Sequence, residues 1–421
     1  MLGCLSKEQH LKKIDSRRLY LLYAFVSGLS DKIVFTTAVI YRLEEAGLDA
    51  LQLVLVGTTL ELTVMIFEVP TGILADLYSR RLSVIIGTAL IGIGFVLEGS
   101  LPLFWVILLA QFVWGFGYTF TSGAEQAWIT DELGVEKAGK VFIQARQAFL
   151  TGSLLAIPIS VALASQSLAL PYLVGGSTRV ALGLILIAVM AETNFKARDK
   201  AKRETFRDMF ETSRKGWQSI VRNKRLIIFS VIILFVGLYS EGWDRLYGAH
   251  LLENFTFPSL WGFEASTVMW FGLLSALTLI GGILANEAAK RMVKTTDTKQ
   301  IMSLLSGIHF GMVAAMAGFA LSGHFTWAVI AILVFGILRS TSYPLESAWV
   351  NQQIDSEVRA TVLSMHGQID ALGQISGGPL IGYLGRLTGV RTAILSAAGI
   401  LLPAPVLYVW LRRLSGKPKN E

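Results

Sequence analysis

Residues 72–81 read GILADLYSRR, which places a glycine, an aspartate and two arginines between two long apolar runs. The run before it covers 50–71 and the run after it covers 82–100. Each run is long enough to cross a bilayer as a helix, which needs about 20 apolar residues. The stretch 72–81 is therefore predicted to be a short polar turn that joins two membrane-spanning helices.

The composition of the whole chain agrees with a membrane protein. Hydrophobic residues make up 53% of the 421 residues, and only 16% are charged, against about 25% in soluble domains. Stretches such as 82–97 and 394–411 are continuously apolar, whereas β-barrel strands alternate. The sequence predicts an all-α integral membrane protein with twelve spans, near 19–41, 50–71, 82–100, 103–131, 139–164, 172–192, 226–248, 265–286, 300–321, 325–350, 359–384 and 391–412.

The basic residues predict how the chain is oriented. We count 29 of the 37 Lys and Arg residues in the amino terminus, the even-numbered loops and the carboxyl tail. Cytoplasmic loops carry such an excess, so both termini are expected in the cytoplasm of a bacterium, with the spans in its inner membrane. The net charge of +7 then reflects topology and contact with membrane lipids, not nucleic-acid binding. The single Cys4 excludes an intramolecular disulfide and a cysteine-built metal site.

The chain divides into two similar halves. Residues 125–128 and 346–349 read EQAW and ESAW, and residues 72–76 match 282–286 in the same order along the chain. Such repeats predict two pseudo-symmetric six-helix bundles with a binding site between them. The expected parts are a cytoplasmic N-terminus (1–18), an N-terminal bundle (19–192), a basic cytoplasmic linker (193–225), a C-terminal bundle (226–412) and a cytoplasmic tail (413–421).

The linker carries aromatic and aliphatic residues at near-helical spacing, namely Phe206, Phe210, Trp217 and Val221. This spacing predicts an amphipathic helix on the membrane surface. The alternative is a flexible basic tether in which the aromatic residues have no shared role.

Residues 72–81 resemble the G-x-L-A-D-x-x-G-R-R/K signature of the major facilitator superfamily, with Ser79 in place of the second glycine. With the two-fold repeat, the resemblance covers nearly the whole chain. The preceding residues 67–72, FEVPTG, resemble a variant found in drug:proton antiporter branches that include tetracycline, macrolide and siderophore exporters. The resemblance implies a secondary transporter that works by alternating access.

The signature is predicted to form a gate. Gly72 would permit a close helix approach, and Asp76 would accept hydrogen bonds from amides at the start of a helix in the other half. Arg80 and Arg81 would bridge to carboxylates or lipid phosphates. The alternative is that both arginines are ordinary positive residues of a cytoplasmic loop.

Charged residues inside the spans are energetically costly in a membrane, so each is expected to have a functional role or a partner of opposite charge. The predicted proton-coupling residues are Asp31, Glu241, Asp244 and Arg245. Asp31 lies deep in the first span, where loss of hydration suits a carboxyl group to take up and release protons. Its alternative is a permanent ion pair with Lys32 or Arg245. Glu241 and Arg245 are four residues apart and should pair on one helix face, which would leave Asp244 freer.

The resemblance implies that spans 1, 4, 7 and 10 line a central cavity. The substrate-cavity residues expected there are Lys32, Gln111, Trp114, Tyr118, Trp243, Tyr247 and Arg339. Gln111 stands where many relatives have an arginine linked to proton transfer. Glu125 on span 4 is expected to pair with Arg146 on span 5, and His366 could partner Glu346 in the same way. Five acids against three bases on these spans favour neutral or cationic solutes slightly.

No Walker A loop, nucleophile elbow, zinc-binding H-E-x-x-H helix or dinucleotide fingerprint is found, so we expect no enzyme, no catalytic residue and no metal. The predicted function is proton-coupled efflux of an amphipathic, drug-like small molecule by a monomer. The expected energy source is the proton gradient, and no cofactor is expected. The alternatives are a lipid or lysophospholipid translocator or a siderophore exporter, then a solute importer, then a non-transporting membrane enzyme or sensor.

Overall fold

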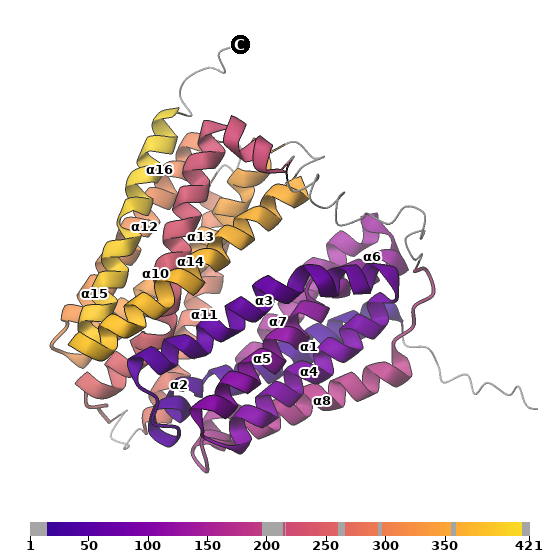
Figure 1. Cartoon of the computed structure of the whole chain (residues 1–421), viewed down its shortest axis with the longest axis horizontal. Helices are drawn as coiled ribbons and strands as arrows, with labels where there is room; N and C mark the ends of the chain where they lie inside the picture. Colours follow the sequence, from indigo (N-terminus) through magenta and orange to yellow (C-terminus); the bar gives the residue numbers. More distant parts are fainter. Residues whose placement is uncertain are drawn as a thin grey trace, which may run out of the picture.

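The structure, a computed structural model, describes residues 15–195, 214, 216–259, 266–293, 297–354 and 359–414. Within these ranges every regular element is a helix. Figure 1 shows two groups of helices, α1 to α8 from the first half of the chain and α10 to α16 from the second half. The predicted all-α class is confirmed.

The elements of the first group are α1 (Ser16–Phe35), α2 (Ala38–Ile40), a π-helical turn (Tyr41–Glu45), α3 (Ala50–Leu77), α4 (Arg80–Ser100), α5 (Phe104–Thr121), α6 (Ala124–Leu133), α7 (Val135–Ala164) and α8 (Leu170–Val189). Those of the second group are α10 (Lys224–Asn254), α11 (Thr267–Met292), α12 (Thr298–Leu321), α13 (Phe325–Gln353), α14 (Arg359–Thr388), α15 (Val390–Leu401) and α16 (Pro403–Leu414).

Eleven helical segments of the described chain are long and apolar enough to cross a membrane, and they correspond to eleven of the twelve predicted spans. The remaining predicted span, 359–384, coincides with α14. This helix has 30 residues but is not among the eleven apolar segments. Its polar residues include His366, Asp370 and Gln374, which lowers its hydropathy below that of its neighbours.

Two of the predicted spans are interrupted. Gly123, with φ of 73°, separates α5 from α6 inside the predicted span 103–131. This left-handed conformation suits glycine because it has no Cβ. The last span, 391–412, is divided into α15 and α16 between Leu401 and Pro403, since a proline cannot continue the hydrogen-bond ladder of the preceding turn.

The helices have a terminal end, at which α1 begins and α16 ends, and a distal end opposite to it. The two groups touch toward the distal end, where the first turns of α3 pack on α14 and on α10. Gly378 and Gly382 of α14 lie against Val54 of α3, at distances that leave little room for a side chain. Toward the terminal end the two groups diverge, as Figure 1 shows.

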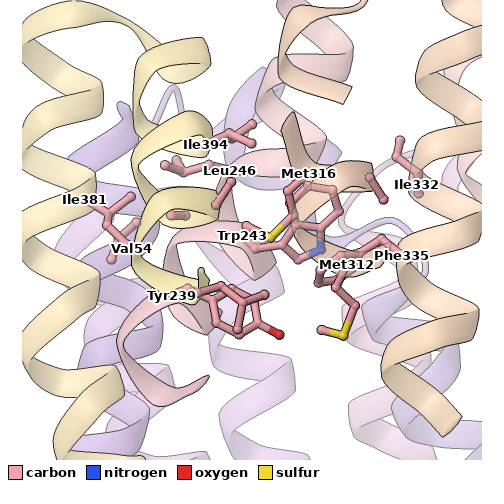
Figure 2. Close-up of a cluster of buried hydrophobic side chains, with 14 of the residues drawn as sticks. Val54, Tyr239, Trp243, Leu246, Met312, Met316, Ile332, Phe335, Ile381 and Ile394 are labelled. Carbon is pink, nitrogen blue, oxygen red and sulfur yellow. The ribbon is translucent and has the colours of Figure 1, made fainter. Parts of the chain in front are cut away.

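A buried cluster that forms part of the wall of the second group holds α10 in place. Figure 2 shows Trp243 of α10 beside Phe335 of α13 and the sulfur-containing side chains of Met312 and Met316 from α12. The ring centroids of Trp243 and Phe335 are 4.1 Å apart. Because these large side chains are packed from three helices, the polar residues that α10 also carries are held at fixed positions.

Only part of the predicted linker helix can be described. Residues 216–222 are helical, with Trp217 and Val221 exposed and Ile220 buried. Phe206 and Phe210 lie outside the described residues, as do most of the predicted N-terminal segment and tail.

Candidate functional site

A cavity of about 1490 Å³ lies between the two groups of helices. It is lined from α1 and α7 on one side and from α10, α11 and α13 on the other. The lining continues to Lys290 and Asn351, which are in the last turns of α11 and α13 at the terminal end. At the distal end, by contrast, the two groups pack together. The cavity is therefore accessible from the terminal end, where the groups diverge.

The two groups contribute unequally to the wall. The first group supplies five of the 29 lining residues, namely Lys32, Phe35, Thr36, Arg146 and Leu150. The second group supplies the other 24, including the aromatic residues Trp243, Tyr247, Phe271, Phe335 and Tyr343. The rings of Trp243 and Tyr247 are stacked, with centroids 5.8 Å apart. The cavity thus has a largely apolar and aromatic wall with a few charges placed on it.

Asp244 and Arg339 form a closed ion pair on this wall. Arg339 of α13 donates through both terminal nitrogens to the two carboxylate oxygens of Asp244, with Nη2 2.9 Å from Oδ2. Such two-pronged pairs are among the strongest hydrogen bonds between side chains. The expectation that Asp244 is freer than Glu241 is therefore wrong. Sequence reasoning missed the pair because the partners are 95 positions apart.

Glu241 and Arg245 pair on one face of α10, as expected from their spacing. Arg245 Nε is 3.0 Å from Glu241 Oε2. Gly57 of α3 lies directly against this pair, and a side chain at position 57 would overlap the Glu241 carboxylate. The pair is thus positioned where the two groups of helices meet, and not on the wall of the cavity.

Asp31 is held by a residue that the sequence analysis did not identify. Its Oδ1 is 3.8 Å from Nη1 of Arg179 on α8, and Arg179 is itself buried. The Arg179 guanidinium also lies 5.6 Å from the ring of Tyr23. The predicted alternative partners of Asp31, Lys32 and Arg245, are therefore not its partners in this structure. A lone arginine within the apolar run 170–189 was the available signal.

Glu125 belongs to the same region of the first group. It lines a small buried pocket with Tyr23 and Trp128, and the charge of Arg179 acts on it. Arg146, its expected partner, lines the cavity and stacks on Phe149 instead. The predicted pair between Glu125 and Arg146 is wrong, because Glu125 lies in a pocket within the first group and Arg146 lies in the cavity between the groups.

The expected pairing of His366 with Glu346 is also wrong. Glu346 accepts a hydrogen bond from the Tyr408 hydroxyl at 2.9 Å and lies 3.5 Å from His309 Nε2. His366 instead contacts the Ser230 hydroxyl at 3.2 Å.

Three expected cavity residues lie elsewhere, since no residue of α5 lines the cavity. Gln111 is buried and donates from Nε2 to Glu98 Oε2 at 2.6 Å, within a network that includes Arg42 and Tyr172. Trp114 packs behind Phe35, with ring centroids 5.3 Å apart. Tyr118 is 45% exposed on the same helix. The other four expected residues, Lys32, Trp243, Tyr247 and Arg339, do line the cavity.

The predicted turn over 72–81 is wrong, because α3 continues to Leu77 and α4 begins at Arg80, so only residues 78 and 79 join the two helices. The charged residues of this stretch bond within the first group. Arg80 bonds to the Asp131 carboxylate and lies 3.4 Å from Asp76. Arg81 donates to the carbonyl oxygens of Met190 and Ile187, at 2.6 and 2.7 Å. Gly72 has open space where a side chain would be, so the close approach expected there is not made in this conformation.

A carboxylate that the sequence analysis also missed is Glu61 of α3. It lies one helical turn beyond Gly57 and therefore shares a face with the residue that touches the Glu241–Arg245 pair. The charges that act on it come from Glu241, Arg245 and Asp370. Among the described residues, no cluster of three or more histidine, cysteine, aspartate or glutamate side chains could hold a metal ion.

Comparison with known proteins identifies the family. Residues 20–369 match the sequence profile of the Major Facilitator Superfamily. The chain belongs to this superfamily. A relative in Bacillus subtilis (strain 168), the uncharacterized MFS-type transporter YxaM, is 21% identical over 396 residues, which cover 93% of this chain and 94% of that protein. The family and the name of this relative point to a transporter and not to an enzyme.

Several solved structures share the fold at low sequence identity. A mutant form of the nucleoside transporter NupG has a TM-score of 0.77 at 16% identity, over 94% of this chain and all of the other. A POT family transporter in complex with 5-aminolevulinic acid has a TM-score of 0.74 at 11% identity, over 95% of this chain and 96% of the other. A bacterial homolog of the human lysosomal transporter Spinster, in an inward-facing and unoccupied conformation, has a TM-score of 0.72 at 14% identity. The match covers 96% of this chain and 98% of the other.

Proposed function

We propose that the chain is a proton-coupled exporter of an amphipathic small molecule and that it works by alternating access. The observation that carries this proposal is the cavity between the two groups of helices, accessible at the terminal end and closed at the distal end by α3, α10 and α14. A cavity accessible from one end at a time is what alternating access requires. With both termini in the cytoplasm of a bacterium, as the basic residues favour, this conformation faces inward.

The proposed coupling site is Asp31. It is a carboxylate within a membrane-spanning segment, and its partner Arg179 lies at the outer limit of an ion pair, 3.8 Å away. Asp31 Oδ1 accepts no hydrogen bond from the described residues. A loosely held carboxylate can exchange a proton at a smaller cost than one fixed by two hydrogen bonds.

The direct test is transport by the purified protein in proteoliposomes. A panel of radiolabelled amphipathic compounds is measured by counterflow, and then for accumulation with and without an imposed pH gradient. We expect exchange of at least one compound without a gradient and its accumulation against a concentration difference with one. Failure to move any compound contradicts transport, and accumulation that does not respond to pH contradicts proton coupling.

Direction is tested separately in membrane vesicles of the two orientations. An exporter accumulates its substrate in energised inside-out vesicles, whereas an importer does so in right-side-out vesicles. Movement of a fluorescent lysophospholipid between leaflets, with no movement of soluble compounds, would instead support the lipid translocator.

A further inference from the structure

The charges that line the cavity are mostly basic, and two of them have no acidic partner. The ionisable lining residues are Lys32, Arg146, Asp244, Glu287, Lys290 and Arg339. They comprise four bases and two acids, which gives a formal charge of +2. The carboxylates that favoured cationic solutes, Asp31, Glu125, Glu241 and Glu346, are not among them.

The two acids on the wall are already paired. Asp244 is bound by both prongs of Arg339, and Glu287 is 2.9 Å from Arg291 and 3.9 Å from Lys290. Neither Lys32 nor Arg146 lies within 4 Å of a carboxylate in the described part of the chain. The positive charge of the cavity is thus left uncompensated on the wall formed by the first group.

Lys32 and Arg146 lie at different depths. Helices α1 and α7 run side by side, because Arg17 bonds to Gln144 near the terminal end and Ser160 bonds to the carbonyl of Ile33 further along. Arg146, two residues after Gln144, is therefore level with about Leu19, whereas Lys32 lies 13 residues or about 20 Å deeper, at 1.5 Å per residue. The two basic residues are therefore attached to the wall at different depths of the cavity.

The surroundings of Lys32 are aromatic. Phe35 and Thr36 follow it on the same wall, and Trp243, Tyr247 and Phe271 face the cavity from the second group. An ammonium group in a partly dehydrated pocket attracts an anion more strongly than in water. Flat apolar walls beside it accept a ring or an alkyl chain.

We propose that the transported solute is an amphipathic organic anion, whose charged group binds Lys32 while its apolar part lies against Phe35, Trp243 and Tyr247. Arg146 attracts the anion at the mouth of the cavity. This inference rests on the proposed transport function, since it names the substrate class of the same cavity. It replaces the slight preference for neutral or cationic solutes expected from the sequence.

The experiment compares two nearly isosteric probes, 1-naphthaleneacetate and 1-naphthaleneacetamide, which differ in charge. Binding to the purified protein in lipid nanodiscs is measured by calorimetry at low ionic strength. We expect the carboxylate to bind at least tenfold more tightly than the amide. Equal affinities, tighter binding of the amide, or no saturable binding of either probe would overturn the proposal.

Variants then assign the preference to Lys32. Lys32→Gln should remove the difference between the two probes and leave the amide affinity unchanged, whereas Lys32→Arg should keep the difference. Lys290→Gln is the matched control, because Lys290 lines the mouth of the same cavity but is 79% exposed and lies near Glu287. A preference that survives in Lys32→Gln contradicts the assignment, and the wild-type comparison stands even if that variant does not fold.

These measurements need no gradient and no vesicle, so they are independent of the transport assay. Anion-selective binding without counterflow would contradict the proposed function and leave the ligand class intact. Counterflow of neutral or cationic compounds alone would support the proposed transport function and contradict the anionic ligand class.

Discussion

Charged residues on or next to the cavity wall are held differently in the two groups of helices. In the second group, Asp244 and Arg339 are joined by two hydrogen bonds on the cavity wall. In the first group, Asp31 and Arg179 are 3.8 Å apart, and Lys32 and Arg146 have no carboxylate partner in the described residues. On the proposals above, the Asp244–Arg339 pair fixes part of the second wall, whereas the loosely paired Asp31 binds a proton and the unpaired Lys32 binds a ligand on the first.

The largest effect is expected at the loose pair. Asp31→Asn keeps the shape of the side chain but cannot carry a proton, so accumulation driven by a pH gradient should fall at least tenfold. Exchange in counterflow should remain. The measurement is accumulation and exchange of the same labelled substrate in proteoliposomes. If Asp31→Asn still accumulates substrate fully against its gradient, coupling takes place elsewhere, and Glu61→Gln becomes the variant to test.

The tight pair is expected to show a smaller but measurable coupling energy. A double-mutant cycle with Asp244→Asn and Arg339→Gln, measured by equilibrium unfolding in detergent micelles, should give about 1.5–3 kcal/mol, the range for hydrogen bonds to charged groups. The matched cycle with Lys32→Gln and Asp244→Asn should give a coupling near zero. Equal coupling energies in the two cycles would remove the contrast between the walls.

These two cases indicate how much the sequence could reveal. The all-helical class, the positions of eleven spans and the Glu241–Arg245 pair depend on hydropathy and on spacing within one helix, which the sequence contains. The partners of Asp31 and Asp244 are on other helices, 148 and 95 positions away. Their contact depends on how each helix is rotated about its axis, which apolar surroundings on all sides do not specify.

Some of the missed residues did leave a signal. Arg179 is the single charge of its apolar run, and Glu61 is one of two acids in the predicted span 50–71. Charged residues are costly enough in a membrane to be treated as candidates wherever they occur. Neither residue lies on spans 1, 4, 7 or 10, where the cavity residues were expected. Gln111 was expected on the cavity wall because helical spacing alone cannot distinguish the cavity from the interior of a bundle.

A moderate effect is expected where the groups meet. Gly57→Ala would put a methyl group onto the Glu241 carboxylate, and such overpacking costs about 1–3 kcal/mol. The apparent Tm in detergent should therefore fall. Gly72→Ala is the control on the same helix, because open space surrounds that position. If Gly57→Ala and Gly72→Ala have the same Tm, α3 can move away from α10 without loss of stability.

The smallest effect is expected at Asp76, which is 40% exposed on its side chain and lies 3.4 Å from Arg80. If Asp76 closes the terminal end by bonding to the other group in the opposite conformation, Asp76→Asn should increase the share of molecules that are open there. Losing about 1.5 kcal/mol would change the ratio roughly tenfold. Spin-label distances across the mouth report this ratio. An unchanged distribution would assign residues 72–81 to folding or membrane insertion.

The contact of α3 with the glycines of α14 gives the molecule a long lever. Val54 lies at the fulcrum and Asp76 near the other end of the same helix, 22 residues or about 33 Å away at 1.5 Å per residue. Because this end of α3 is bonded to the first group, a rotation of that group by about 10° at the fulcrum displaces its terminal end by roughly 6 Å, about the diameter of an aromatic ring. Gly378 and Gly382 set how closely α3 can approach. One added methyl group at the fulcrum would tilt α3, and the resulting displacement would grow along the helix toward the mouth. The width of the mouth would then depend on residues at the far side of the membrane.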